Sequence, residues 1–383
     1  MQFDLIKMDY EVREEISHNV QSVYGEPEMT EHDSAFLCGL LIEYKPEKVL
    51  EVGVAAGYTT AIILGCLEKI GQKYQMHSMD YSEHYYRGNG KMQTGFVAGE
   101  YIENNRIISH QFHLGGTICD YIDDIGNDID FLILDTMHSL PGELLDFLVL
   151  LPYLRDGAVV CLHDVSLNNR VRGWGFQNAT NVLYHSVVGD KLVNWTNENP
   201  DARVAYPNIA AFRINPDTRK YIENVFLSLT MTWRYIPPCN DLIAYGKRMR
   251  ESYSWDLYKV FLNALWMNTR MKYEFPTNLI QKGKRIVLYG AGNVGQEYNR
   301  WIEQTNYVDL VAWVDQNYKD ITKGADNREI IVQNPDTVTT IEYDLILIAV
   351  IDHRAASTIS NNLITKGVDV RKIVWTGKEV YEF

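Results

Sequence analysis

The chain has two segments in which a short apolar run ends in a glycine-containing turn and leads into a helical stretch. The first is VLEVGVAAGYTT at residues 49–60, and the second, IVLYGAGNVGQ, begins at Ile286. Around both segments, short apolar runs alternate with helical stretches. This alternation predicts α/β folds, in which parallel strands are covered by helices on both faces of a sheet.

Two sheets are expected, because 383 residues exceed what one ordinary core accommodates. The first sheet takes strand-like runs at 48–54, 75–80, 106–113, 128–135, 158–164 and 208–214. The second takes RIVLYG, VDLVAWVD, EIIV, DLILIAV and KIVWTG, all from Lys284 onward. We therefore predict one domain at 1–235, a helical connector at 236–281 and a smaller α/β domain at 282–383.

The charge and hydropathy patterns exclude several classes of protein. A net charge of −14 argues against a general nucleic-acid or anionic-membrane binder, which would need clustered Lys and Arg. The longest apolar run, LLDFLVLLPYL, is interrupted by Asp146 and is too short to span a bilayer. The N-terminal residues carry acids where a signal peptide needs basic and then apolar residues. We expect a cytoplasmic protein that acts on a small molecule, with a homo-oligomer left open.

The cysteines predict no covalent framework. There are five of them, at positions 38, 66, 119, 161 and 239, with scattered spacing and no C-x-x-C pair. An odd number in this arrangement is typical of a protein whose thiols are reduced and that has no structural zinc.

The turn of the first segment has the order Glu51-x-Gly53-x-x-x-Gly57. A dinucleotide fold has G-x-G-x-x-G instead, so that backbone amides crowd a pyrophosphate. An acid would repel a phosphate and attract an ammonium or sulfonium group, and S-adenosylmethionine carries both cations and no phosphate. Asp80 ends the next strand, where a carboxylate can accept hydrogen bonds from two ribose hydroxyls. The alternative is a strand–turn–helix with an incidental glycine pair and a solvated aspartate.

Between residues 45 and 215 this combination resembles the class I S-adenosylmethionine-dependent methyltransferases. The resemblance implies a Rossmann-like domain with a mostly parallel seven-stranded sheet, and S-adenosylmethionine as the cofactor. It also implies the residues that contact the cofactor, which are Glu51, Gly53, Ala55, Gly57, Tyr58, Asp80 and Tyr81.

Polar residues follow the fourth and fifth predicted strands, at the edge where parallel α/β sheets bind ligands. They are Asp135, His138, His163 and Asp164. They resemble the site of the O-methyltransferases of the macrolide-sugar and cephalosporin group, in which an acid after strand four and an acidic pair after strand five hold magnesium. The resemblance places Mg²⁺ at Asp135 and Asp164. His163 departs from the pattern, because magnesium prefers oxygen ligands, and a metal-free site is the alternative.

A sugar hydroxyl is a poor nucleophile until a base takes its proton. Asp135, His138 and His163 are the catalytic candidates, because histidine titrates near neutral pH and a carboxylate also accepts protons. The sequence favours His163 or Asp135 without ranking the two. His138 could instead bond a carbonyl group at a helix start, and Asp164 could cap the segment that follows it.

The second segment carries Gly290-x-Gly292-x-x-Gly295, and Asp315 ends the next strand. This order matches the dinucleotide pattern. The domain resembles the small Rossmann-like domains attached to bacterial sugar-modifying enzymes, which implies a nucleotide or nucleotide-sugar at these glycines and at Asp315. Glycines that serve only tight packing of helix on strand are an equal alternative.

Together these features predict a methyltransferase that uses S-adenosylmethionine and O-methylates a sugar hydroxyl. The acceptor would be a nucleotide-sugar or a surface-glycan precursor in polysaccharide biosynthesis. One alternative is an NAD-dependent oxidoreductase that works through the C-terminal domain. Another is a non-catalytic protein that binds nucleotide-sugars or takes part in assembly.

Overall fold

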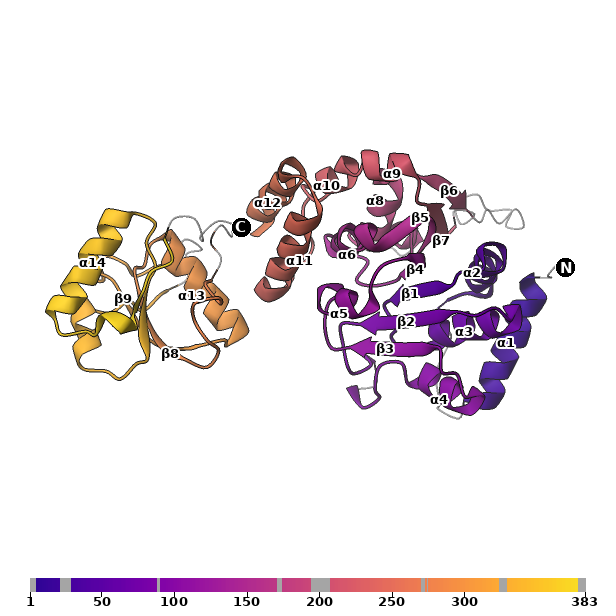
Figure 1. Ribbon diagram of the computed structural model, residues 1–383, viewed down its shortest axis with the longest axis horizontal. Helices are drawn as coiled ribbons and strands as arrows, with labels where there is room; N and C mark the ends of the chain where they lie inside the picture. The colour runs from indigo at the N-terminus through magenta and orange to yellow at the C-terminus, as the bar shows by residue number, and fades with distance from the viewer. Residues whose placement is uncertain are drawn as a thin grey trace. The chain divides into compact units, whose positions relative to one another are not determined.

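The computed structural model (Figure 1) describes residues 5–20, 29–87, 90–170, 174–193, 207–269, 273, 275–323 and 329–377. The chain forms two compact units, which are described separately. The first unit comprises residues 1–236 and 247–264, and the second comprises residues 237–246 and 265–383. Each unit contains its own sheet.

The first unit has a seven-stranded sheet in the order β3-β2-β1-β4-β5-β7-β6. Its strands are β1 (Lys48–Val52), β2 (Gln75–Asp80), β3 (His110–Leu114), β4 (Ile129–Leu134), β5 (Leu154–His163), β6 (Asp190–Val193) and β7 (Ile209–Arg213). Paired strands run parallel except for β7, which is antiparallel to both β5 and β6. The predicted mostly parallel seven-stranded sheet is confirmed, and β6 is a strand that the sequence pattern did not indicate.

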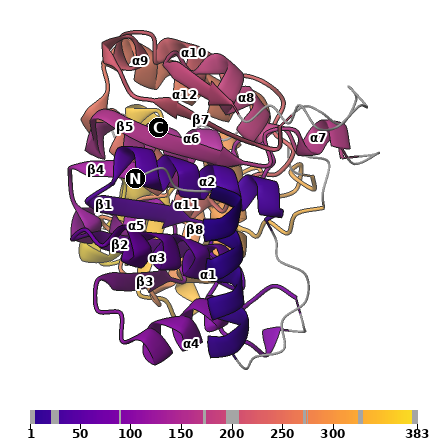
Figure 2. The same cartoon turned by 90° about the vertical axis from the view of Figure 1, so that its right-hand side faces the viewer.

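Helices cover both faces of this sheet (Figures 1 and 2). One face carries α1 (Leu5–Asn19), α2 (Glu31–Tyr44), α3 (Tyr58–Ile70) and α4 (Phe96–Asn105). The other carries α5 (Ile118–Ile125), α6 (Gly142–Leu150), α8 (Ala179–Ser186) and α10 (Glu223–Ser228). Further helices are the 3-10 helix η2 (Leu151–Tyr153), α7 (Leu167–Arg170), α9 (Pro216–Lys220), α11 (Cys239–Ser252) and α12 (Trp255–Thr269).

Strand β4 shows why the central strands read as apolar runs. All six of its residues, IDFLIL, are buried between the two helical layers. The one acid among them, Asp130, accepts the backbone amides of Glu47 and Lys48 at 2.8 and 2.9 Å and pairs with Arg155 at 2.8 Å. A buried carboxylate is tolerated when it is paired in this way, so β4 stays in register beside β1.

The second unit has a four-stranded parallel sheet in the order β11-β10-β8-β9. Its elements are β8 (Arg285–Tyr289), α13 (Asn293–Thr305), β9 (Asp309–Val314), η3 (Pro335–Thr339), β10 (Leu345–Ile348), α14 (His353–Thr365), η4 (Val370–Lys372) and β11 (Ile373–Val374). The predicted strand at 329–332 was wrong, because only isolated bridges flank it and Ile331 is 84% exposed. Val332 is buried, but its neighbour Ile331 faces solvent, and a single buried β-branched residue does not make a strand.

The structure also corrects the prediction that the thiols are reduced. Cys38 of α2 and Cys66 of α3 form a disulfide, and their Cα atoms lie 6.1 Å apart. Both side chains are fully buried. The pair was missed because the spacing of cysteines in the sequence does not show that α2 and α3 pack side by side. The other three cysteines, which are buried and outside this disulfide, are Cys119, Cys161 and Cys239.

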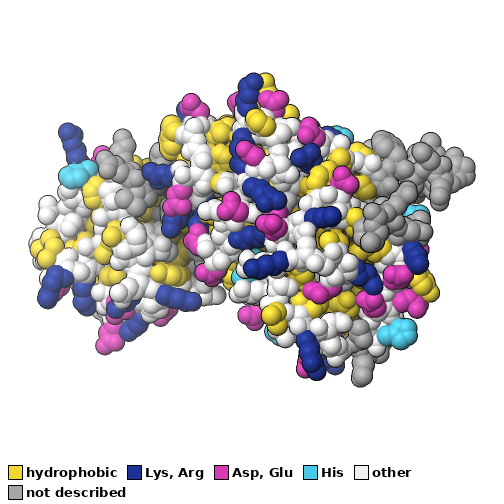
Figure 3. All heavy atoms as spheres, turned by 45° about the vertical axis from the view of Figure 1, so that its right-hand side comes forward, with side chains coloured by type: hydrophobic (Ala, Val, Ile, Leu, Met, Phe, Trp, Pro, Cys, Tyr) yellow, Lys and Arg dark blue, Asp and Glu magenta, His cyan; other side chains and the backbone are white. Residues whose placement is uncertain are grey.

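One face of the described surface is mixed in charge. On the face in Figure 3, Lys and Arg side chains are interspersed with Asp and Glu side chains. Such interspersion differs from the contiguous basic surface that binds nucleic-acid phosphates. Within the described part of the chain, no helix combines the length and the hydropathy needed to cross a membrane.

Buried histidines between β2 and β3 are expected to make the first unit sensitive to acid. His77 is 2% exposed and its Nδ1 lies 3.0 Å from Nε2 of His113. Burial, with a contribution from His113, lowers the pKa of His77 to about 4. The folded state therefore favours the neutral form of His77 over the protonated form. The free energy of unfolding that this adds is fully present above pH 6.5, the ordinary pKa of histidine, and is lost as the pH falls towards 4.

We expect the stabilisation due to His77 to fall by about 2 kcal/mol between pH 7.5 and pH 5. Urea unfolding of wild type and His77→Gln at both pH values measures this difference. The variant should lose less stability on acidification than wild type does. Equal losses in the two proteins would contradict the prediction, whatever the other titrating groups contribute.

Candidate active site

Two glycines shape the loop that follows β1. Gly53 has a φ of +99°, and a Cβ atom on it would lie 1.8 Å from the carbonyl oxygen of Asp135. Gly57 caps the start of α3 with a φ of +87°, and a Cβ atom there would lie 2.9 Å from the Cα atom of Gly95. The glycines therefore let the loop backbone pass directly against the end of β4 and the start of α4.

Asp80 holds this loop from the end of β2. Its Oδ2 accepts the backbone amides of Val54 and Ala55 at 2.9 and 3.0 Å, and its Oδ1 accepts the amide of Ser82 at 2.9 Å. A carboxylate that accepts several amides fixes the loop strongly, because hydrogen bonds to a charged group are the stronger ones. Asp80 thus organises the loop, a role additional to the predicted contact with a ribose.

Glu51 was expected from the sequence to be negatively charged, and the structure indicates that it is mostly neutral. Its side chain is buried in β1, and the Thr60 hydroxyl donates to its Oε2 at 2.7 Å. Burial raises the pKa of Glu51 to about 8, so the carboxyl is mostly protonated at neutral pH. The expected attraction for a cationic ligand was therefore overstated, because the sequence does not show how completely this position is buried.

The other predicted cofactor contacts surround the same loop. Ala55 has a left-handed φ of +51°, and its carbonyl oxygen accepts the Gly95 amide at 2.9 Å. Tyr58 is the first residue of α3, and the guanidinium of Arg13 lies 5.7 Å from the centre of its ring. Tyr81 follows Asp80 and is 59% exposed, so its ring faces solvent beside the loop.

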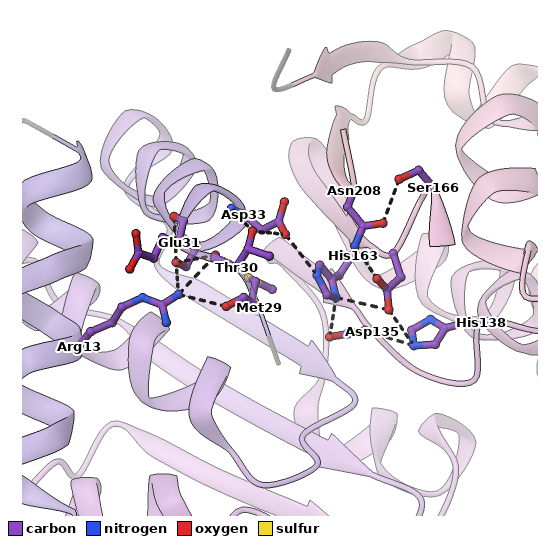
Figure 4. Close-up of polar contacts among 12 residues, drawn as sticks. Arg13, Met29, Thr30, Glu31, Asp33, Asp135, His138, His163, Ser166 and Asn208 are labelled. Atoms are coloured by element: carbon purple, nitrogen blue, oxygen red, sulfur yellow. Dashed lines mark hydrogen bonds and ion pairs between the residues drawn. The ribbon is translucent and has the colours of Figure 1, made fainter. Parts of the chain in front are cut away.

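The structure brings together the polar residues at the ends of β4 and β5 (Figure 4). Oδ2 of Asp135 lies 3.2 Å from Nδ1 of His163, and its Oδ1 lies 3.6 Å from Nε2 of His138. That Nε2 is also 3.3 Å from Oδ2 of Asp164. Carboxylates and imidazoles therefore alternate across the site.

Two residues that the sequence analysis missed support this cluster. Glu143, in the first turn of α6, accepts the backbone amide of His138 at 2.6 Å and lies 3.4 Å from its Nδ1. Asn208, just before β7, donates from Nδ2 to Oδ1 of Asp164 at 2.6 Å. Neither residue stands in a motif. An acid at a helix start and an amide before a strand are ordinary positions, so the sequence held no signal for them.

The acids around the two histidines favour protonated imidazoles. Burial alone would lower the pKa of His163, but Asp135, Asp33 and Asp164 outweigh it and hold that pKa well above its ordinary value. Burial also opposes the charge on His138, yet its acidic neighbours raise its pKa to about 9. Burial opposes ionisation of Asp135 too, and the two imidazoles nevertheless lower its pKa. At neutral pH Asp135 is therefore the group among these three that is unprotonated and able to accept a proton.

The four side chains of the cluster differ in how much of their surface is exposed to solvent. The side chains of Asp135, His138 and Asp164 are 21%, 19% and 16% exposed, whereas that of His163 is 5% exposed. A substrate can therefore contact the first three. Nδ1 of His163 contacts the site at Asp135, 3.2 Å away, and lies 3.8 Å from Oδ2 of Asp164.

The same three partly exposed residues could hold a divalent cation. Asp135, His138 and Asp164 each offer a ligand atom, and these atoms all lie within 4.8 Å of one another. The sequence placed the metal at Asp135 and Asp164 alone, so His138 is an addition. One imidazole with two carboxylates suits Mn²⁺, Fe²⁺ or Zn²⁺ as well as Mg²⁺.

The loop between β8 and α13 in the second unit is built similarly. Oδ2 of Asp315 accepts the backbone amide of Ala291 at 2.7 Å. Gly290 has a φ of +113°, and a Cβ atom on Gly295 would lie 1.9 Å from the Gly290 carbonyl oxygen. A Cβ atom on Gly292 would meet nothing within 4 Å. Packing thus accounts for two of the three glycines and leaves Gly292 open to a ligand.

Residues 50–165 match a protein family described as a methyltransferase domain. This segment, which is less than half of the chain, is therefore similar to methyltransferase domains. It begins within β1 and ends after Asp164, so it contains the loop at Gly53 and the cluster of acids and histidines. The enzyme class predicted from the sequence, a methyltransferase, is therefore confirmed, whereas the description of the family names no methyl donor. The match does not identify the acceptor.

Outside the methyltransferase domain, residues 282–374 match a family described as C2185-like, N-terminal. That description names neither a ligand nor an activity. It gives no support to the predicted kinship with domains of sugar-modifying enzymes, and nucleotide binding by this unit stays a prediction. No curated protein matches the chain.

Solved methyltransferase structures are similar to the chain over about half of its length. The O-methyltransferase TomG from Streptomyces achromogenes, in complex with SAM, has 14% identity and a TM-score of 0.37, with 56% of this chain and 92% of TomG covered. The O-methyltransferase from Bacillus cereus, in complex with SAH, has 16% identity and a TM-score of 0.33, with the same coverage. The Podospora anserina methyltransferase PaMTH1 has 11% identity, a TM-score of 0.37, and 56% and 89% coverage. Such low identities and scores carry no argument, so the assignment rests on the family match.

Proposed function

We propose that the methyltransferase domain transfers the methyl group of S-adenosylmethionine to a hydroxyl oxygen of a small acceptor. The observation that carries this proposal is the direct approach of the Gly53 backbone to Asp135. This approach joins the loop after β1 to the cluster of acids and histidines. A methyl donor bound on the loop would therefore lie beside a proton acceptor of the cluster.

In the proposed complex, S-adenosylmethionine lies over the loop from Gly53 to Gly57. Asp80 would accept hydrogen bonds from the ribose hydroxyls while it keeps the loop amides that it already binds. Tyr58 and Tyr81 would border the adenosyl group. Because Glu51 is buried and bonded to a hydroxyl, we assign it to the shape of the loop and not to an ionic contact.

The acceptor hydroxyl would lie over Asp135 and His138. Its oxygen lone pair forms the new bond to the methyl carbon, while the carbon–sulfur bond breaks and its electron pair stays on sulfur as a neutral thioether. The hydroxyl proton passes to Asp135, which is ionised and partly exposed. His138 donates a hydrogen bond from Nε2 to the oxygen as it loses the proton, and Glu143, which lies 3.4 Å from Nδ1, keeps His138 oriented.

A metal ion would be held by Asp135, His138 and Asp164. When bound, such a cation would make the coordinated hydroxyl more acidic by withdrawing electron density from its oxygen. The residues themselves supply a positive charge in the imidazole of His138, which lies between the two carboxylates. Metal-free and metal-assisted transfer are therefore both testable on one protein.

For the acceptor, we propose a sugar hydroxyl on a nucleotide-sugar or on a surface-glycan precursor. Support comes from the resemblance of the strand-end residues to the macrolide-sugar methyltransferases. Carboxylates, imidazoles and amides are also the groups with which a protein holds sugar hydroxyls.

The test is calorimetric titration of the full chain with S-adenosylhomocysteine, S-adenosylmethionine and NAD, followed by assays of methyl transfer to a panel of nucleotide-sugars. We expect both adenosyl ligands to bind and radioactive methyl to reach a nucleotide-sugar. Transfer that stops in EDTA and returns with Mn²⁺ or Mg²⁺ would assign the metal. NAD binding without adenosyl binding would overturn the proposal, and adenosyl binding without transfer would favour the non-catalytic alternative.

A further inference from the structure

We propose that Asp33, in the first turn of α2, is a positioning residue that orients His163 against Asp135. This inference rests on the proposed function, because it concerns how the proton acceptor Asp135 is held. Neither the strand-end pattern nor the family match includes Asp33, which lies before the matched residues 50–165.

Carboxylates lie near both nitrogens of the His163 ring, with Asp33 at Nε2 and both Asp135 and Asp164 at Nδ1. Nε2 lies 3.9 Å from Oδ2 of Asp33, and Nδ1 lies 3.2 Å from Oδ2 of Asp135 (Figure 4). The side chains of Asp33 and His163 are only 9% and 5% exposed. Water therefore has little access to the Nε2 side, and Asp33 is the carboxylate that faces it.

This geometry defines what Asp33 does for the site. A buried imidazole that keeps a partner at only one nitrogen can turn to find another, because an unpaired buried polar group is costly. Turning the ring would take Nδ1 away from Asp135. The acid on α2 therefore keeps His163 in the one orientation that holds the Asp135 carboxylate facing the acceptor.

The carboxylate of Asp33 is itself fixed by the start of its helix. Thr30 caps α2, and its hydroxyl donates to Oδ2 of Asp33 at 2.6 Å. Arg13 of α1 donates to the carbonyl oxygens of Met29 and Thr30 at 3.2 and 3.3 Å, and Asp9 pairs with Arg13 at 2.9 Å. Contacts between α1 and α2 thus hold the start of α2, and with it the Asp33 carboxylate beside Nε2 of His163, in place.

A purely structural role for Asp33 makes a different prediction. Acids in the first turn stabilise a helix through its dipole and its unsatisfied amides, and α2 has a second acid there, the exposed Glu31. If Asp33 only stabilises the helix, removing either charge should affect His163 to the same small extent. If Asp33 orients His163, only its own removal should do so.

The test uses the full chain labelled with ¹⁵N-histidine, with the imidazole signals of His163 assigned by their absence in His163→Gln. Asp33→Asn is compared with the matched control Glu31→Gln. We expect the imidazole nitrogen resonances of His163 to shift in Asp33→Asn and to stay at their wild-type positions in the control. Thr30→Val, which removes the hydroxyl bound to Asp33, should give a smaller shift in the same direction and serves if Asp33→Asn does not fold.

Affinity for S-adenosylhomocysteine, measured on the same proteins, should stay within about threefold of wild type, because Asp33 lies on α2 and not in the loop from Gly53 to Gly57. Unmoved His163 signals in both Asp33→Asn and Thr30→Val would overturn the positioning role. So would equal shifts in Asp33→Asn and Glu31→Gln. Absence of S-adenosylhomocysteine binding in wild type would instead count against the proposed function, and the comparison of His163 signals would still decide the role of Asp33.

Discussion

Replacing Asp80 by alanine should lower the affinity for S-adenosylhomocysteine by about 100-fold or more, which corresponds to roughly 3 kcal/mol. The carboxylate accepts the amides of Val54 and Ala55, and in the proposed complex it also accepts the ribose hydroxyls. Alanine removes both functions at once. Hydrogen bonds to a charged group contribute about 1.5–3 kcal/mol each, so losing the loop contacts and the ribose contacts together gives an effect of this size.

The chain contains a matched control for this experiment. Asp315 ends β9 and accepts the amide of Ala291 with the same oxygen, Oδ2, in the loop of the second unit. Asp315→Ala should therefore leave S-adenosylhomocysteine binding at the wild-type level. Calorimetry on wild type and both variants makes the comparison. If Asp315→Ala weakens binding and Asp80→Ala does not, the cofactor lies on the second loop and the assignment of the first loop is wrong.

Replacing Gly53 by alanine should lower the free energy of unfolding of the first unit by about 3–5 kcal/mol, or prevent folding. The Cβ atom would lie 1.8 Å from the carbonyl oxygen of Asp135, and the φ of +99° is unfavourable for alanine in any surroundings. The obstacle cannot easily move, because the amide of Asp135 donates to the carbonyl oxygen of Val52 at 2.9 Å.

Gly99, within α4 of the same unit, is the control for Gly53. A Cβ atom there would meet nothing within 4 Å, and alanine is favoured over glycine inside a helix by about 1 kcal/mol. Gly99→Ala should therefore match or exceed wild-type stability in urea unfolding, whereas Gly53→Ala should fall far below it. Similar stabilities for the two variants would show that the loop can move away from the end of β4.

The sequence predicted those parts of the site that depend on strand ends. Asp135 and His163 come together because β4 and β5 are parallel neighbours, so their carboxyl ends meet at one edge of the sheet. The same rule brought Asp80 to the loop after β1. The ends of these strands could be predicted because an apolar run and the turn after it are contiguous in the sequence.

The parts that were missed depend on contacts between distant segments. Asp33 reaches the site because α2 packs beside β5, and Asn208 reaches it because β7 turns back antiparallel along β5. Neither arrangement leaves a periodic pattern in the chain. The burial of Glu51, which changes its charge state, likewise depends on neighbours that the sequence does not name.

The division of the chain between its two units determines how they can be separated. Residues 247–264 belong with residues 1–236, although 237–246 between them belong with the second unit. Within the first unit, the Tyr253 hydroxyl donates to the Leu148 carbonyl oxygen at 2.6 Å. Cleavage of the chain at one position therefore cannot yield a complete first unit without residues of the second unit. A fragment that ends at residue 236 discards Tyr253, and a fusion or gene exchange that preserves the enzyme has to carry the chain through residue 264.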